Sequence, residues 1–502
     1  MMERQPPAAA FRPGARPLRL HHLPPALRPL VRAYLMGYFS AVAPRLLTLL
    51  LQIVSRRRNN TNKVLADNGN SHSVLESVAR ILRTGLELHR FPTFCAALVG
   101  GSTLLQMLWL PYAAPFHRLI DASAKNLDRA WRLRLARWLS TFIAGWLSLQ
   151  LLQSKRSSKP LETKSETDLR RNPPAGFTPK IFAGRTLDLT LFAVTRALDV
   201  LVGEFWDQHR NRRQAARTWT WFEQFLAKTI DPIVFTVSLG LIMWSWFYSP
   251  ERLPPSFNKW ITSAASVDQR LIEALRRCRN GELVYGQETG QSPLLGSMCA
   301  DYQLPHEWGD PTKCIPFPCD LAHMGSSPSC EIHAVHRFFQ SWKWSMSTYL
   351  PLTLALQLRN PRRLDPVKAV ASASRSSSFL AACITLFYYS ICLCRSRIGP
   401  RLLGTDNAAR QRIDGGLCVT AGCFACGWGA LIETAGRRKD LAMFVAPRAL
   451  ATLLPRRYPV EQQWHERLVF AASTAVVFAF VLEKPKSARG VFGKILGAVL
   501  RS

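Results

Sequence analysis

The sequence predicts an all-α, polytopic membrane protein made of two homologous helical bundles of four to five helices each. The first observation is composition: 48% of the 502 residues are hydrophobic, and they gather in blocks. The 65 Lys and Arg residues, against 33 Asp and Glu, gather in the gaps between these blocks. The second observation is an internal repeat, which changes a fold prediction more than any local pattern does. Apolar blocks that occur twice in the same order favour two bundles over a row of soluble domains.

The repeat is clearest in an apolar stretch with an arginine in its middle. Seven residues recur with identical spacing, at Asp188, Leu189, Phe192, Arg196, Ala197, Leu198 and Leu201, and at Asp440, Leu441, Phe444, Arg448, Ala449, Leu450 and Leu453. Further pairs follow the same order in both halves: Phe94 with Phe379, Gly145-Trp146 with Gly427-Trp428, Val234-Phe235 with Val469-Phe470, and Pro250 and Phe257 with Pro485 and Phe492. The sequence therefore predicts an internal duplication, with loops of different length in the two copies.

The duplication divides the chain into four parts. Residues 1–89 are a basic, Pro-rich N-terminus with an amphipathic helix, and residues 90–275 are the first membrane repeat. Residues 276–335 are a cysteine-rich connector, and residues 336–502 are the second membrane repeat. The N-terminus lacks the short apolar core of a secretory signal. Its prolines disfavour the amphipathic helix of a mitochondrial presequence, so any organelle address is expected inside the chain.

The expected membrane spans are apolar stretches near the length that crosses hydrocarbon, which is about 20 residues. They are residues 91–113, 135–152, 187–205 and 230–248 in the first half, and 378–393, 415–432, 441–454 and 468–482 in the second. Residues 27–54 and 338–358 are either further spans or helices in the headgroup plane. Four spans per copy would give parallel repeats, and five would give inverted ones. Lys and Arg occupy nearly every loop, which leaves orientation open; a soluble helical protein is the alternative fold.

Charged residues inside the apolar stretches are the first candidate site. Asp188 and Arg196 lie eight positions apart, close to two helical turns, and Asp440 and Arg448 repeat them. An arginine facing lipid costs several kcal/mol, so these side chains should face the bundle interior. They are either a solute or lipid-headgroup site or, as the favoured interpretation, structural links between helices. A packing role is expected for the small-residue positions with their neighbouring tryptophans, Gly145, Trp146, Gly427 and Trp428.

The connector is the second candidate site, because it is rich in cysteine and histidine. The residues that could bind a metal or form disulfides are Cys299, Cys314, Cys319, Cys330, His333 and His336. Thiolate and imidazole are zinc ligands, but the spacing matches no compact zinc finger, and disulfides would form in an oxidising space. Metal, disulfide and neither remain open. The cysteines near apolar spans, including Cys392 and Cys394, are interpreted as packing residues.

Charge and motifs restrict the partners and the chemistry. A net charge of +32 suits membrane lipids with an anionic surface or nucleic acid. Nucleic acid is not expected, because no nucleic-acid-binding signature is present; a homo-oligomer is possible. There is no nucleophile elbow, phosphate-binding loop, dinucleotide fingerprint or zinc-protease motif. The sequence therefore predicts no enzymatic activity and no cofactor.

Two segments carry a family resemblance. One runs through Pro305-His306, Trp308, Cys314 and Cys330 to Ser347-Thr348-Tyr349-Leu350-Pro351-Leu352; the other joins Gly427-Trp428-Gly429-Ala430-Leu431-Ile432-Glu433, Arg437-Arg438 and the following helix. They resemble the cysteine-rich start, first helix and small-residue span of the transmembrane protein 135 family, a family of peroxisomal membrane proteins. The likeness covers roughly residues 91–290 and 305–500. The chain departs from the animal pattern in the order of its halves and in the long insert at residues 154–179.

The resemblance implies membrane residence in peroxisomes or mitochondria. It implies a role in organelle organisation and dynamics, including mitochondrial fission balance, and in lipid homeostasis. The chain is also distantly similar to the four-span superfamily of mitochondrial translocases and small peroxisomal membrane proteins, and no catalytic residues carry over. The leading expectation is a non-enzymatic organelle membrane protein. The alternative is a transporter or pore for a small solute or lipid that uses the two Asp/Arg pairs at the repeat interface.

Overall fold

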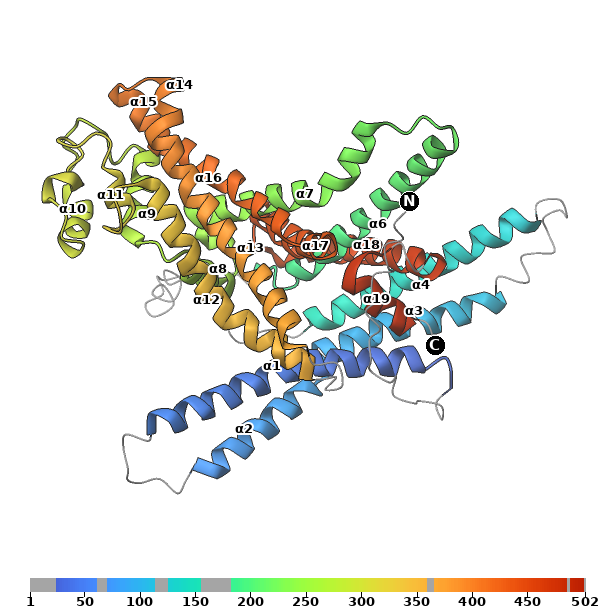
Figure 1. The fold of residues 1–502 in the computed structure, drawn as a ribbon. Coiled ribbons are helices and arrows are strands. Elements are labelled where there is room, and N and C mark those ends of the chain that lie inside the picture. The colour runs from blue at the N-terminus through green and yellow to red at the C-terminus, as the bar shows by residue number, and fades with distance from the viewer. Residues whose placement is uncertain are drawn as a thin grey trace. The chain divides into compact units, whose positions relative to one another are not determined.

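A computed structural model describes residues 24–60, 70–112, 125–154, 182–358, 365–484 and 488–500. Nearly all of these residues form helices (Figure 1). The strands in this part of the chain are β1 (Phe182–Ala183) and β2 (Tyr458–Pro459), which pair antiparallel. The all-α prediction is therefore confirmed. Most of the insert at 154–179 and the repeat position Pro485 lie outside the described residues.

The chain forms two compact units. The first contains Met1–Ser157, Thr474–Pro485 and Ile495–Ser502, and the second contains Ser158–Ser473 and Lys486–Lys494. Helices α18 (Gln463–Glu483) and α19 (Gly490–Leu500) each contribute residues to both units.

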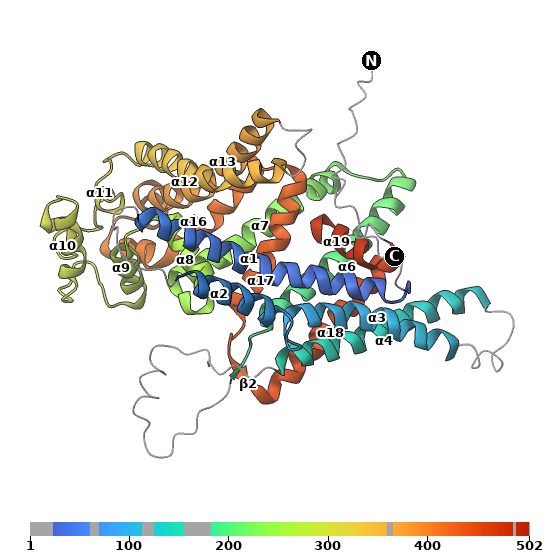
Figure 2. The same ribbon diagram turned by 90° about the horizontal axis from the view of Figure 1, so that it is seen from below.

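Long helices packed side by side build the first unit. They are α1 (Arg28–Asn60), α2 (Asn70–Gly85), α3 (Phe91–Tyr112) and α4 (Lys125–Gln153). Helix α3 packs against both α1 and α4 (Figure 2). A small-residue contact brings α3 and α4 together, since a Cβ on Gly101 would lie 3.1 Å from the Cβ of Ala144. Within the same unit Arg134 pairs with Glu483 at 2.8 Å.

A bundle of helices forms the body of the second unit. Its members are α6 (Leu187–Ala215), α7 (Trp221–Tyr248), α13 (Pro366–Leu393), α16 (Cys418–Cys426), the 3-10 segment η7 (Gly427–Ile432) and α17 (Ala435–Leu453). Helix α7 packs against α16 and α17, and α13 packs against α16. Gly427 permits one close approach, because a Cβ there would lie 2.4 Å from the Cα of Thr236. Trp428 points outward and is 45% exposed, and Gly145 and Trp146 lie on α4.

The cysteine-rich connector is ordered and belongs to a lobe of short elements. These are η2 (Pro250–Arg252), α8 (Pro255–Ala265), α9 (Gln269–Asn280), α10 (Ser292–Asp301), η3 (His306–Gly309) and α11 (Cys319–Ala322). The lobe caps its own helices: Asp268 accepts a bond from the backbone of Arg270 at the start of α9, and Gly281 ends α9 at φ +77°. The long helix α12 (Cys330–Leu358) leaves the lobe and runs along α13 (Figure 1).

Two π-helical segments interrupt the second half. Helix α13 continues into η5 (Cys394–Ile398) and α14 (Gly399–Leu403), while α15 (Asn407–Arg412) continues into η6 (Ile413–Leu417) and α16. Segment η8 (Val460–Gln462) precedes α18. Such π-bulges are rare, and they occur frequently at functional sites. Here they bring η5 and η6 into contact with each other, and η6 against α9 of the connector lobe.

Six stretches of the described chain are long and apolar enough to cross a membrane. They are Arg28–Leu50, Phe91–Leu108, Trp221–Tyr248, Pro366–Leu403, Asn407–Ile432 and Val460–Glu483. Five of the eight expected spans fall in this set, as does the uncertain stretch at 27–54. The expected spans at 135–152, 187–205 and 441–454 do not, and neither does 338–358. The helices α4, α6 and α17 that hold the first three are richer in charged residues. The chain is thus an integral membrane protein with several candidate spans.

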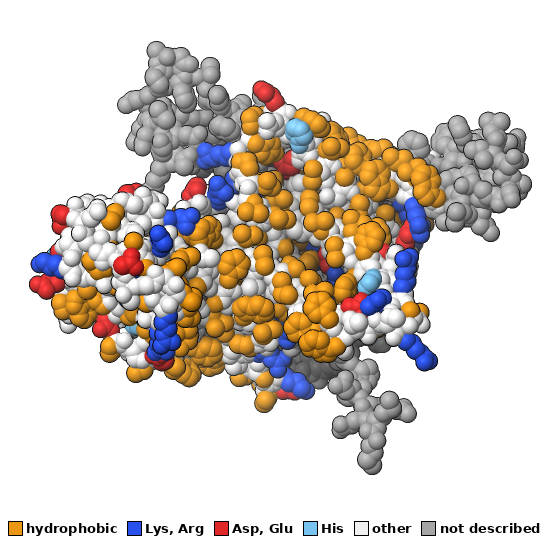
Figure 3. Space-filling view, turned by 90° about the horizontal axis from the view of Figure 1, so that it is seen from above, with side chains coloured by type: hydrophobic (Ala, Val, Ile, Leu, Met, Phe, Trp, Pro, Cys, Tyr) orange, Lys and Arg blue, Asp and Glu red, His pale blue; other side chains and the backbone are white. Residues whose placement is uncertain are grey.

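The surface of the molecule agrees with a lipid environment. Hydrophobic side chains spread over the middle of the face in Figure 3, whereas the side where Figure 1 places α10 and α11 carries mixed polar and charged groups. On α1, Phe39 is 63% exposed, Leu47 58% and Leu50 57%. Large apolar side chains exposed to this extent are rare on soluble monomers. Lipid tails would cover it in a membrane.

Candidate functional site

Arg196 lies on α6 with its guanidinium held between two aromatic rings. The carbon Cζ is 5.1 Å from the ring centre of Phe192, one turn earlier, and 5.1 Å from that of Phe492. Arg196 is only 8% exposed, and its Nε and Nη1 have no hydrogen-bond partner among the described residues. Asp199 lies one turn further on and pairs with Arg489 at 2.9 Å. Burial lowers the pKa of Arg196, while the charge of Asp199 raises it.

Arg448 occupies a similar setting on α17. Its Cζ is 3.7 Å from the ring centre of Phe444, one turn earlier, and 5.7 Å from that of Phe257 on α8. Burial lowers the pKa of Arg448, and the charge of Asp188 raises it. Each arginine therefore contacts the phenylalanine of its own helix and a second one from the other half of the sequence. That second contact comes from the positions paired in the repeat, Phe257 and Phe492.

The two aspartates do not pair with the arginine of their own helix. Asp188 is 56% exposed and forms an ion pair with Arg456 at 3.5 Å. Asp440 accepts a hydrogen bond from the backbone N–H of Val491 at 3.2 Å, at the start of α19. Asp440 also raises the pKa of Arg196, so the charge of each aspartate acts on the arginine of the other half.

A buried ion pair that the sequence did not single out joins the two π-helical segments. Arg395 in η5 donates to both carboxylate oxygens of Asp414 in η6, at 2.6 and 3.0 Å. Their side chains are 3% and 1% exposed. Tyr285 donates its hydroxyl to Asp414 at 2.6 Å, and Arg395 donates to the carbonyl of Phe317 at 3.0 Å. Burial and the Asp414 charge raise the pKa of Tyr285, so its hydroxyl remains a donor. In the sequence, Arg395 closely follows one expected span and Asp414 directly precedes another, and this position was the only sign of the pair.

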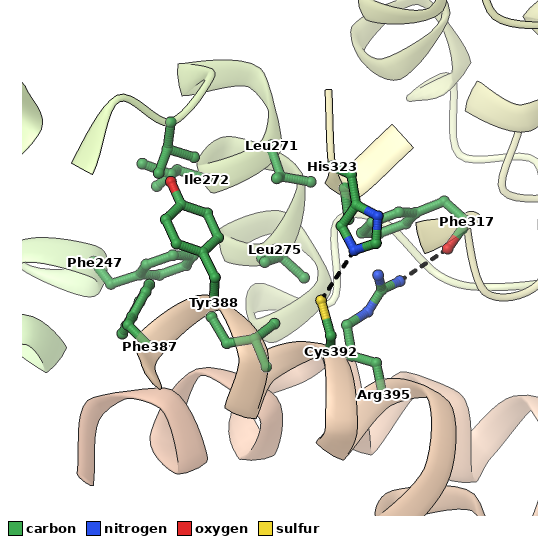
Figure 4. Close-up of a pocket in the computed structure, with 13 residues that line it drawn as sticks. Phe247, Leu271, Ile272, Leu275, Phe317, His323, Phe387, Tyr388, Cys392 and Arg395 are labelled. Atoms are coloured by element: carbon green, nitrogen blue, oxygen red, sulfur yellow. Dashed lines mark hydrogen bonds between the residues drawn. The ribbon is translucent and has the colours of Figure 1, made fainter. Parts of the chain in front are cut away.

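Next to this ion pair, four side chains form what we term the cysteine–histidine cluster: Cys319, His323, Cys330 and Cys392. The ligand atoms of the first three lie within 4.8 Å of one another. The sulfur of Cys392 is 3.2 Å from His323 Nε2. Figure 4 draws this contact, and the Cys392 thiol also interacts electrostatically with that of Cys330. Burial raises the pKa of Cys319 to about 11, against which the charge of Arg395 acts. The cluster borders an apolar cavity of about 40 Å³.

A second histidine, His333, packs against the histidine of this cluster. The ring of His333 stacks on His323 with centres 4.2 Å apart, and its Nδ1 contacts Ser326 Oγ at 2.7 Å. Burial lowers the pKa of His323 and brings that of His333 to about 3, so both rings are neutral at pH 7. His336 is exposed.

The other two predicted connector cysteines, Cys299 and Cys314, are not part of the cluster. Cys299 is fully buried on α10, and the Cys314 sulfur contacts the carbonyl of Pro316 at 4.0 Å. Of the predicted metal or disulfide residues, the structure thus brings together Cys319 and Cys330, with His333 stacked on the neighbouring His323. It adds His323 and Cys392, which lay outside the predicted set. Within the described residues every one of the 12 cysteines is free.

Comparisons with protein-family models, with curated proteins and with solved structures find no match to this chain.

Proposed function

We propose that this chain is a non-enzymatic integral membrane protein of peroxisomes or mitochondria that supports organelle organisation and lipid homeostasis. Six apolar stretches long enough to cross a membrane support the membrane part of this proposal. The choice of organelles and the role in lipid homeostasis rest on the family resemblance carried by the connector and by the segment that includes Gly427 to Glu433.

Two homologous repeats are part of this proposal, and the arginine contacts are the observation that carries it. Arg196 contacts Phe192 and Phe492, and Arg448 contacts Phe444 and Phe257. Phe257 and Phe492 are equivalent positions in the sequence repeat. A duplication followed by an exchange of contacts between copies produces this reciprocity, because each copy presents the same residue to its partner.

The same geometry favours a structural role for the arginines. A guanidinium over an aromatic face gains about 0.5–2 kcal/mol, and more where water is excluded. Each arginine makes two such contacts, one with a phenylalanine of its own half and one with a phenylalanine of the other half. The second contact links the repeats. We therefore propose that Arg196 and Arg448 join the two halves of the bundle.

Transport is the second candidate function, and one observation favours it. Arg196 keeps two buried nitrogens without a hydrogen-bond partner among the described residues, and Asp199 Oδ2 is in the same condition. Buried polar atoms are normally satisfied, so unpartnered ones point to water or a bound solute. A carboxylate or phosphate group would satisfy the arginine.

Two experiments separate these functions. Fluorescent fusions of the full chain should overlap peroxisomal or mitochondrial markers, and deletion of the gene should change the number or shape of that organelle. In liposomes the purified chain should leave permeability to small anions unchanged. A flux that Arg196→Ala abolishes at normal protein level would favour the transporter instead. Exclusion from both organelles would reject the proposed role.

A further inference from the structure

We propose that Cys319, His323, Cys330 and Cys392 form a structural zinc site that fastens the connector lobe to the end of helix α13. This inference does not depend on the organelle or on transport. Three thiolates and one imidazole are an established ligand set for structural zinc, in which four protein ligands close the tetrahedron.

The ligands come from three separate segments. Cys319 opens α11, and His323 follows directly after it. The backbone N–H of His323 donates to the carbonyl of Cys319 at 2.7 Å, so the two side chains share one face of a helical turn. Cys330 is the first residue of α12, and Cys392 lies near the C-terminal end of α13. A short connector motif thus supplies three ligands, and a membrane helix supplies the fourth.

The distances are close to those that zinc requires. Zn–S bonds of about 2.3 Å in a tetrahedron place sulfur atoms about 3.8 Å apart. The ligand atoms of Cys319, His323 and Cys330 already lie within 4.8 Å of one another, and those of Cys392 and His323 within 3.2 Å. A rotation of the Cys392 side chain would bring its sulfur, which already faces His323 Nε2, into the tetrahedron.

The histidine is oriented as a zinc ligand. His323 Nδ1 lies 2.7 Å from the carbonyl oxygen of Ser327. A carbonyl only accepts, so Nδ1 must carry the proton and Nε2 keeps its lone pair. Nε2 is the atom that faces the sulfur of Cys392 (Figure 4). Metal-binding histidines commonly donate their other N–H to a backbone carbonyl in this way, which fixes the tautomer and the ring.

Positive charge lies beside two of the thiols, and the other two ligands are shielded from water. Cys330 lies at the N-terminus of a 29-residue helix, where the partial positive charge stabilises an anion. Arg395 supplies a full positive charge to Cys319. His323 and Cys392 are 1% and 5% exposed. Zinc is favoured over magnesium or calcium because those ions prefer oxygen ligands.

The test is the metal content of the full chain. The protein is purified in detergent with a tag that lacks histidine, under reducing conditions, and zinc is measured by plasma mass spectrometry. We expect about one zinc ion per chain. Cys319→Ser, Cys330→Ser and Cys392→Ser should each lose at least nine tenths of it. The matched controls Cys314→Ser and Cys394→Ser, which change neighbouring cysteines outside the cluster, should retain it.

A second measurement tests the proposal even if the serine variants fail to fold. Cobalt exchanged into the wild-type chain should give the visible bands of tetrahedral Co²⁺ and a thiolate charge-transfer band. His323→Cys, which keeps four ligands, should retain zinc where His323→Ala loses it. Wild-type protein without stoichiometric zinc, controls that lose zinc equally, or a Cys319–Cys330 disulfide in protein alkylated without reduction would each overturn the proposal.

Discussion

The buried pair of Arg395 and Asp414 provides the sharpest prediction about stability. Asp414→Asn keeps the size of the side chain and removes its charge. In the structure the carboxylate accepts two bonds from Arg395 and one from Tyr285, and both members of the pair are at most 3% exposed. An amide replaces one acceptor oxygen by a donor, so one of these partners loses its bond. The guanidinium then stays buried without a counter-charge.

The expected loss follows from this burial. Removing one partner of a buried ion pair costs about 3–5 kcal/mol, because the remaining charge stays away from water. At about 1.4 kcal/mol per tenfold change, the folding equilibrium constant falls by roughly 10²-fold to several thousand-fold. The exposed pair of Lys368 and Asp365 is the matched control, since Lys368 is 83% exposed. Lys368→Ala should cost about 1 kcal/mol or less.

The assay is reversible unfolding in mixed micelles, followed by helical circular dichroism. Adding Arg395→Met to Asp414→Asn should recover part of the loss, because the unpaired charge disappears. Two results would refute the reasoning: a cost for Asp414→Asn no greater than for Lys368→Ala, or a double variant whose cost is the sum of the two single ones.

The other predictions concern helix packing and the arginines. Gly427→Ala places a Cβ 2.4 Å from the Cα of Thr236, a backbone atom that cannot rotate away, and should cost about 1–3 kcal/mol in the same unfolding assay. Gly436→Ala is its control, with nothing within 4 Å, and should leave stability unchanged or slightly higher. Arg196→Ala should lower the yield of monodisperse protein more than Arg448→Ala, because Arg196 is only 8% exposed. Equal yields at wild-type level would argue against structural links.

The helical class and most spans could be predicted because they depend on local hydrophobicity. Three stretches that were predicted as spans are not among the six, because their helices carry many charged residues. The helix α6 carries Asp188, Arg196 and Asp199 within its first half, and α17 begins with Arg437 and further charges. Such helices depend on their bundle partners, which single-sequence periodicity does not describe.

The candidate site was only partly predictable, because its fourth ligand comes from a distant helix. Cys319 and Cys330 were singled out by their connector context. Cys392 lies in an apolar span, where a cysteine is usually a small packing residue. Its contact with His323 arises when α12 folds back along α13, and no spacing in the sequence reports that contact.

The arginine contacts could be predicted in part. The repeat identified Arg196 and Arg448 as equivalent positions and paired Phe257 with Phe492. It did not show that each phenylalanine lies over the arginine of the other half. The Asp–Arg spacing instead favoured pairs within one helix. In the structure Asp188 forms an ion pair with Arg456, and Asp440 accepts a hydrogen bond from the backbone at the start of α19.

Alkaline carbonate extraction of cell membranes tests the membrane claim most directly. The full chain is expressed at native level, membranes are washed at high pH, and the chain is followed in pellet and supernatant beside a known integral protein and a known peripheral one. Six apolar stretches predict that the chain stays in the pellet with the integral marker. Release into the supernatant with the peripheral marker would contradict the account.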